Sequence, residues 1–118
     1  EFDVVVTCNM FGDIITDLGA EIQGGMGLAV SGNINPEGIS MFEPVHGSAP
    51  DIAGENKANP LAAILAASMM VEILGYSEEA AQIEEAVRSS LQADQSTLDM
   101  GGDLTTDQVG NYICSLLE

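Results

Sequence analysis

Four stretches of the chain place apolar residues at the spacing of a helix with one buried face. The first covers residues 10–22, and Asn9 before it is expected to cap its N-terminus. The second, residues 61–74, is apolar nearly all round and is therefore expected to be central and buried. Asn59 and Pro60 mark its start, since a capping side chain followed by proline is typical of a helix N-terminus. The apolar positions of the first helix are Phe11, Ile14, Ile15, Leu18 and Ile22.

The third predicted helix begins at Ser77, which is expected to cap it, and the glutamates that follow suit the positive end of the helix dipole. The last helix begins at Thr105, which is expected to form a capping box with Gln108. Residues 94–105 between them are polar and loop-like. The inward positions are Ala80, Ile83, Val87 and Leu91 in the third helix, and Val109, Tyr112, Ile113, Leu116 and Leu117 in the last.

Three short runs are predicted as strands, which makes the fold α/β. Residues 2–7 are rich in valine, residues 27–30 follow a glycine cluster, and residues 41–45 are interrupted by a proline. Residues 31–38 have turn chemistry, and residues 46–60 form a loop that contains glycine and proline. Because the chain starts inside a strand-like run, we expect it to be the C-terminal part of a longer protein.

Composition and charge narrow the class of protein and of partner. The chain has 118 residues, enough for one domain at most, and its 46% apolar content excludes a disordered or collagenous chain. Nineteen acidic residues face two basic ones, which gives a formal charge of −17. Phosphate backbones and anionic membranes would be repelled, so no nucleic acid or membrane partner is expected. The longest apolar run, residues 61–71, is also too short to span a bilayer.

The acidity has two explanations that the sequence leaves open. One is a halophilic host, since molar salt screens charge within a few Å. The other is selection for solubility alone. The cysteines Cys8 and Cys114 do not make a disulfide framework, and we expect both to be buried thiols in the reducing cytoplasm.

Asp13 and Asp17 are the first candidates for chemistry. They stand four residues apart on a predicted helix, so their carboxylates share one face. No basic residue is near in sequence to offset the like charges, whereas Mg²⁺ or Mn²⁺ would do so with carboxylate and water ligands. The alternative is a solvated acidic face in a very acidic chain.

The loop that contains His46, the chain's single histidine, is the second candidate. Gly47 allows close approach of a ligand to the backbone, Ser48 offers a hydroxyl, and Asp51 can accept hydrogen bonds from a diol such as ribose. The alternative is a connecting loop with a structural histidine. The chain lacks a dinucleotide G-x-G-x-x-G motif, a P-loop, a zinc spacing and a nucleophile elbow.

Three segments are similar to the β-decarboxylating dehydrogenases, the isocitrate/isopropylmalate dehydrogenase family. Residues 9–18 resemble its metal-binding segment, residues 42–54 with 58–60 resemble its NAD loop, and residues 98–102 resemble its C-terminal segment. The resemblance implies the C-terminal part of that family's two-domain fold, which is not a Rossmann fold. Residues 1–23 would end the dimerising, metal-carrying region, and residues 24–118 would belong to the cofactor-binding domain.

The resemblance also implies an enzyme that oxidises a small 2-hydroxy acid with NAD⁺ and then releases CO₂ from its β-carboxylate. Asp13 and Asp17 would ligate Mg²⁺ or Mn²⁺, and the active unit would be a homodimer. The family's substrate-binding arginines and its catalytic lysine and tyrosine have no counterpart in this chain, which is therefore not expected to turn over substrate alone. The implied cofactor-binding residues are Glu43, His46, Gly47, Ser48, Ala49, Pro50, Asp51, Ile52, Ala53, Gly54 and Asn59.

The choice of cofactor is predicted from one residue, and the choice of substrate from the resemblance alone. Asp51 would accept both ribose hydroxyls of NAD⁺ and repel the 2′-phosphate of NADP⁺, so NAD⁺ is expected. The segments are most similar to members that act on 3-isopropylmalate in leucine biosynthesis, and next to those acting on tartrate or D-malate. The rival hypothesis is a non-catalytic, acidic, cation-binding module. Residues 55–57 and Gly32 depart from the family pattern, and we expect them to affect local stability.

Overall fold

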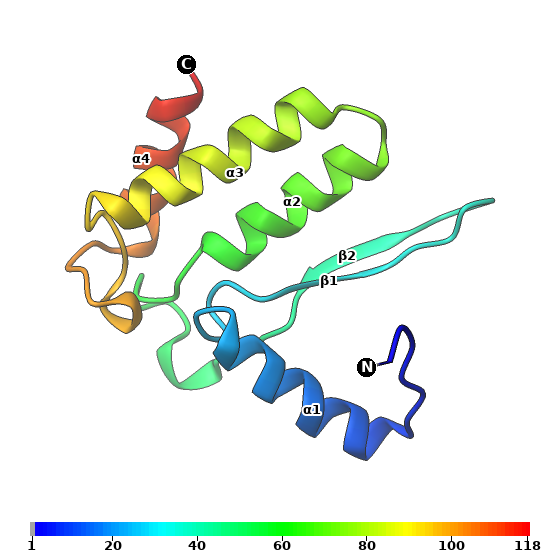
Figure 1. The fold of residues 1–118 in the computed structure, drawn as a ribbon. Helices are drawn as coiled ribbons and strands as arrows, with labels where there is room; N and C mark the ends of the chain where they lie inside the picture. The colour runs from blue at the N-terminus through cyan, green and yellow to red at the C-terminus, as the bar shows by residue number, and fades with distance from the viewer. Residues whose placement is uncertain (1) are drawn as a thin grey trace.

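The computed structural model describes residues 2–118 and has helices on both sides of a β-hairpin (Figure 1). All four predicted helices are present within a residue or two of their expected bounds. In chain order the elements are α1 (Asn9–Ile22), β1 (Val30–Asn33), β2 (Met41–Pro44), α2 (Leu61–Ile73), α3 (Ser77–Gln92) and α4 (Thr106–Leu117), with short 3₁₀ turns at Pro50–Ile52 and Leu98–Met100.

The two strands form an antiparallel hairpin whose register pairs Val30 with Pro44 and Asn33 with Met41. The prediction of a strand over residues 27–30 is wrong, because β1 starts where that range ends and continues over residues 31–33, which were predicted as the start of a turn. Residues 24–28 form a tight turn instead: the Leu28 N–H donates to the Gly25 carbonyl at 3.1 Å, and Gly25 has a positive φ. The alternation along residues 30–33 was too short to predict their pairing partner.

Residues 2–7 do not form the predicted strand. They are exposed throughout and have no secondary structure, although their valine content favours one. A strand is stabilised by pairing with a neighbour, and residues 2–118 provide no strand beside this segment.

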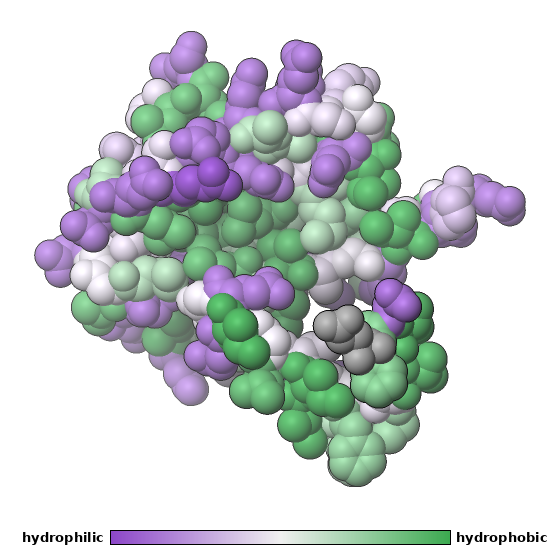
Figure 2. Space-filling view, viewed as in Figure 1, coloured by the Kyte–Doolittle hydropathy of each residue, from purple (hydrophilic) through white to green (hydrophobic). Residues whose placement is uncertain are grey.

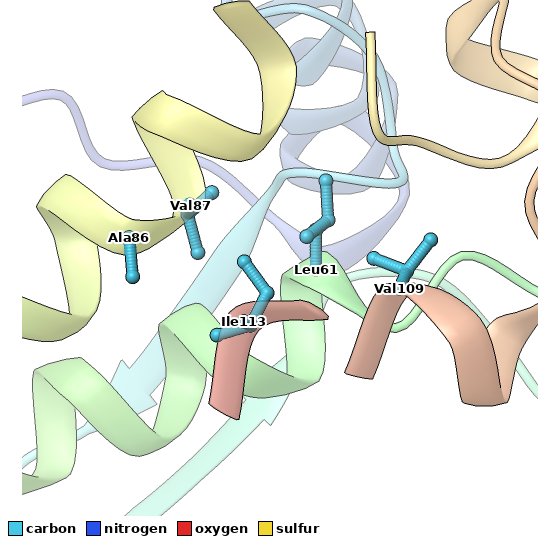
Figure 3. Packing of buried hydrophobic residues seen from close by; sticks show 5 residues of the cluster. All are labelled: Leu61, Ala86, Val87, Val109 and Ile113. Carbon is cyan, nitrogen blue, oxygen red and sulfur yellow. The ribbon is translucent and has the colours of Figure 1, made fainter. Parts of the chain in front are cut away.

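The core lies where α2 packs between the hairpin and α3, and α4 packs against α3 (Figure 1). Leu61 and Val109 are fully buried there. Together with Ala86, Val87 and Ile113 they form the cluster in Figure 3, which joins α2, α3 and α4. α2 is central as predicted, because it contacts both layers. The prediction that it is buried is wrong in part, since Met70 and Ile73 are 40% and 48% exposed. No helix among residues 2–118 has the length and apolar character needed to cross a bilayer.

Several predicted inward positions are exposed at the ends of helices. Leu74 after α2, and Leu116 and Leu117 at the end of α4, are each more than two-fifths exposed. The prediction that they face the core is wrong for the described part of the chain, because nothing in it covers them. The stripes nearer the middle are buried or half-buried, at Ala80, Ile83, Val87, Leu91, Val109, Tyr112 and Ile113.

The apolar stripe of α1 has no cover among residues 2–118. Phe11, Ile14 and Leu18 are each more than half exposed, and Ala20 is the buried residue of this helix. Figure 2 shows apolar side chains over the end of the molecule that α1 forms. The helix was predicted correctly, and its apolar face presents a surface that another part of a larger molecule could bury.

One of the four predicted caps is confirmed in full: Thr105 and Gln108 form the expected capping box. The Asn59 Oδ1 accepts the Leu61 N–H at 2.9 Å, but Pro60, predicted as the first helical residue, occupies the N-cap position of α2. Asn9 and Ser77 are instead the first helical residues, and no side-chain cap bond is formed at α1 or α3.

The prediction of buried cysteines is wrong. Cys8 and Cys114 are both free thiols on the surface. Cys8 precedes the exposed helix α1, and Cys114 follows the buried Ile113 on α4, so its side chain turns away from the core.

Candidate functional site

Asp13 and Asp17 lie on the exposed surface of α1, one turn apart as predicted. Thr16 between them donates to the carbonyls of Gly12 and Asp13, both at 3.0 Å, so its hydroxyl is used within the helix. The described residues contain no cluster of three or more His, Cys, Asp or Glu side chains that could hold a metal. Residues 2–118 therefore supply at most two carboxylates at this point, and neither forms an ion pair with Lys57 or Arg88.

A cavity of about 540 Å³ lies between α1 and the end of the hairpin. Its α1 side contains Thr16 and Gln23, and its hairpin side contains Ser31, Glu43 and His46. Asp13 and Asp17 do not line it. The cavity nevertheless begins on the helix face beside them, so α1 carries the two carboxylates and also forms one wall of the cavity.

His46 is the most informative side chain of this cavity. Its Nδ1 lies 2.9 Å from the Gly47 carbonyl, and a carbonyl can only accept, so Nδ1 carries the proton. In the neutral ring Nε2 is then an acceptor, and it is buried without a hydrogen-bond partner. A buried polar atom without a partner is costly, which points to a donor supplied by a ligand or by another part of a larger molecule.

A second cavity of about 430 Å³ lies between the loop after His46 and the first turn of α4. The backbone around it takes left-handed conformations at Ala49 (φ 43°) and Gly54 (φ 79°). Side chains are absent at Gly47 and Gly54, where a Cβ would meet open space. The lining residues are Ser48, Ala49, Ile52, Ala53, Gly54, Asn56, Lys57, Ala58, Thr106 and Asp107.

The structure divides the predicted cofactor residues among these places. Glu43 and His46 line the first cavity, Ser48, Ala49 and residues 52–54 line the second, and Gly47 lines neither. Pro50 and Asp51 are exposed on the 3₁₀ turn between them and line neither. Asp51 is thus accessible to a ligand lying on this loop.

Asn59 is engaged in holding the fold together. Its amide oxygen caps α2, and its Nδ2 donates to Asp99 Oδ2 at 2.9 Å. Asp99 also accepts from the Thr97 hydroxyl. A Cβ on Gly27 would lie 2.6 Å from Asn59 Nδ2, so glycine is required where this backbone approaches the pair. The side-chain amide is therefore held in one orientation by these two bonds, and one N–H of Nδ2 and one lone pair of Oδ1 remain for other partners.

Sequence reasoning missed several residues that line the cavities. Thr16 and Gln23 are seven residues apart on α1 and so share a face, a signal that could have been found. Asn56 and Asp107 were not identified, since they are far apart in sequence and meet only in the folded chain.

Comparison with known proteins gives a family match and several similar relatives. The sequence pattern of the family described as isocitrate/isopropylmalate dehydrogenase matches residues 1–113. The chain is 62% identical to a 3-isopropylmalate dehydrogenase of Thermobifida fusca over 114 residues, which are 95% of this chain and 31% of that protein. It is 52% identical to a 3-isopropylmalate dehydrogenase of Archaeoglobus fulgidus over 117 residues, which are 99% and 36%.

Solved structures show the same fold. An isocitrate dehydrogenase from Methylococcus capsulatus superposes with a TM-score of 0.89 at 44% identity, over 98% of this chain and 35% of that one. A β-decarboxylating dehydrogenase from Thermococcus kodakarensis gives 0.81 at 44% identity, over 92% and 32%. The chain spans about a third of these proteins, and the predicted fold class is confirmed.

Proposed function

Because this chain belongs to the isocitrate/isopropylmalate dehydrogenase family, we propose that it is the C-terminal third of an NAD-dependent, β-decarboxylating dehydrogenase that acts on 3-isopropylmalate in leucine biosynthesis. The substrate rests on relatives that carry that name at 52–62% identity. The observation that carries the chemical part is the buried, unpartnered Nε2 of His46 beside Glu43 in the cavity next to α1.

The residues of α1 fit a divalent metal ion. Asp13 and Asp17 are two exposed carboxylates at the spacing that lets one hard cation contact both, and Mg²⁺ needs only one or two carboxylates beside water and substrate oxygens. Bound there, Mg²⁺ or Mn²⁺ would act as a Lewis acid toward the substrate's hydroxyl and carboxylate oxygens. The two aspartates hold the ion, and their negative charge favours its binding in an otherwise unpaired acidic region.

The cofactor loop fits NAD⁺. His46 Nε2 would accept a hydrogen bond from a bound hydroxyl or amide, and the side-chain-free Gly47 and Gly54 leave room for a flat group near the backbone. Asp51 is exposed and would accept from the ribose hydroxyls, while its charge would disfavour the 2′-phosphate of NADP⁺. NAD⁺ would supply the hydride acceptor of the reaction.

The reaction proposed here needs groups from outside this chain. No arginine in it lies near either cavity, and Arg88 is paired with Glu85 on α3. Substrate carboxylates and the proton transfers of decarboxylation would therefore be served by residues of the rest of the protein. This chain's own share is to hold the metal ion, the adenosine half of NAD⁺ and one wall of the cleft.

The same proposal covers the domain boundary and the assembly. Residues 1–23 would belong to the dimerising region and residues 24–118 to the cofactor domain, with the cleft between them. The uncovered stripe of Phe11, Ile14 and Leu18 supports an extensive partner surface for α1. A homodimer of the complete protein would bury this stripe together with the rest of the dimerising region.

Steady-state kinetics of the complete protein test the proposed function. We expect oxidation of 3-isopropylmalate with NAD⁺, dependent on Mn²⁺ or Mg²⁺, with release of CO₂. Tartrate and D-malate form the comparison panel: faster turnover of either would move the substrate to that branch of the family. No oxidation of any of the three, with metal bound, would favour the non-catalytic cation-binding module.

A further inference from the structure

Asn56 links the cofactor loop to the first turn of α4 through three hydrogen bonds. Its Oδ1 accepts the Asp107 N–H at 3.1 Å, and its Nδ2 donates to Asp107 Oδ2 at 3.1 Å. Its backbone carbonyl accepts the Thr106 N–H, also at 3.1 Å. We call this group of contacts the Asn56–Asp107 clasp. It joins positions 51 residues apart in the chain.

The clasp requires an asparagine side chain at residue 56. Its amide oxygen faces an N–H and its amide nitrogen faces a carboxylate, so the side chain has one satisfactory orientation. The backbone at Asn56 has φ 57°, a left-handed conformation that asparagine adopts more readily than residues other than glycine. Glycine would tolerate this backbone but would lose both side-chain bonds, and aspartate would place a second carboxylate against Asp107.

The clasp also uses the exposed donors of the α4 N-terminus. The Thr106 and Asp107 N–H groups go to Asn56, and the Gln108 N–H goes to the Thr105 hydroxyl at 3.4 Å. The Thr106 hydroxyl donates to the Ala58 carbonyl at 2.6 Å. This helix end is thus not available to bind an anion, and its donors are directed to holding the loop.

Both partners of the clasp line the 430 Å³ cavity, which also contains the cofactor-loop residues Ser48, Ile52 and Gly54. A loop that is already fixed costs less conformational entropy to order when a ligand binds. We propose that Asn56 is a positioning residue: through the clasp it fixes the cofactor loop and strengthens dinucleotide binding without contacting the reacting atoms. This inference rests on the proposed function.

The test uses the complete protein and measures the Kd of NAD⁺ by titration, together with hydrogen exchange of residues 54–58 and 105–108. Because both clasp side chains are exposed, the free energy that each hydrogen bond contributes lies toward the lower end of the usual range for proteins. We expect Asn56→Asp to raise the Kd about threefold to fivefold and to speed exchange in both segments. Asn56→Gly should do the same while keeping the backbone relaxed, which covers the case that the aspartate variant folds poorly.

A double variant that exchanges the two side chains of the clasp tests whether NAD⁺ binding can be restored. In Asn56→Asp combined with Asp107→Asn, the new amide at 107 can donate to the new carboxylate at 56, and the Kd should return to within twofold of wild type. The single variant Asp107→Asn completes the cycle. The matched control is Asn111→Asp, the same chemical change on the exposed face of α4, which should leave the NAD⁺ Kd unchanged.

Two results would overturn the inference: faster exchange with an unchanged Kd, or a weakened Kd that the double variant does not restore. Either would leave the clasp as a feature of stability only. Failure of the proposed function is a different result, since the wild-type protein would then bind no NAD⁺ at all.

Discussion

Replacement of Gly27 by alanine tests how three distant segments are joined beneath the cofactor loop. A Cβ at this position would lie 2.6 Å from Asn59 Nδ2 and 2.9 Å from Asp99 Oδ2, closer than such contacts occur. The hydrogen bond between those two side chains must then open, or the backbone at 27 must move. Losing an exposed hydrogen bond costs about 1 kcal/mol, and disturbing the Asn59 cap of α2 costs about 1 kcal/mol more.

The expected loss is therefore about 2 kcal/mol of local stability, which corresponds to roughly 30-fold faster amide exchange where opening is local. Hydrogen exchange of the first turn of α2 in the complete protein measures it, since the Leu61 N–H is bonded to Asn59. Gly110→Ala is the matched control: it lies within α4 with open space around its Cβ and should stabilise the helix by about 0.5–1 kcal/mol. Unchanged exchange at α2 in the Gly27 variant would refute the packing described here.

Three further perturbations have defined outcomes. Val109→Ala removes methyl groups from a fully buried position in the core cluster and should lower the free energy of unfolding by about 2 kcal/mol in urea denaturation; a loss below about 0.5 kcal/mol would contradict the burial. Asp51→Lys should raise the ratio of kcat/KM for NADP⁺ over NAD⁺ at least about tenfold, and an unchanged ratio would remove Asp51 from cofactor choice. The complete protein should lose circular dichroism between molar and tens of millimolar salt if the excess of 17 negative charges requires screening; constant ellipticity would contradict halophilic adaptation.

Local signals in the sequence predicted the helices well. The spacing of apolar residues located α1 to α4, and the Thr105–Gln108 capping box was correct in detail. The predicted caps at Asn9 and Ser77 were wrong because both helices begin one residue earlier than expected. Cys8 and Tyr76 therefore occupy the N-cap positions. Cap preferences are worth about 1 kcal/mol, too little to fix a boundary against neighbouring backbone.

Features that depend on distant partners could not be predicted. The register of the hairpin is set across residues 30–33 and 41–44, a run too short to show which residues pair. The conformation of residues 2–7 and the burial of the apolar stripe of α1 depend on what packs against them. A local sequence pattern does not contain that information. Asn56 and Asp107 are joined only by the fold, so the clasp was not visible in the sequence.

The roles of the candidate site residues stay predictions for the same reason. The structure places Glu43 and His46 at one cavity and the following loop at a second, a division that the sequence did not show. The pairing of Asp13 with Asp17 follows from helix geometry alone. Their use as metal ligands and the choice of substrate depend on the rest of the protein and stay predictions.

The proposed function depends above all on Asp13 and Asp17 together holding one divalent ion. Calorimetric titration of the complete protein with Mn²⁺ tests this binding in the wild type, Asp13→Asn and Asp17→Asn. Glu21→Gln, one turn further along the exposed surface of α1, is the matched control for loss of a carboxylate. We expect each aspartate variant to weaken Mn²⁺ binding at least about tenfold, and Glu21→Gln to bind Mn²⁺ as the wild type does. Wild-type Mn²⁺ affinity in either aspartate variant would contradict it.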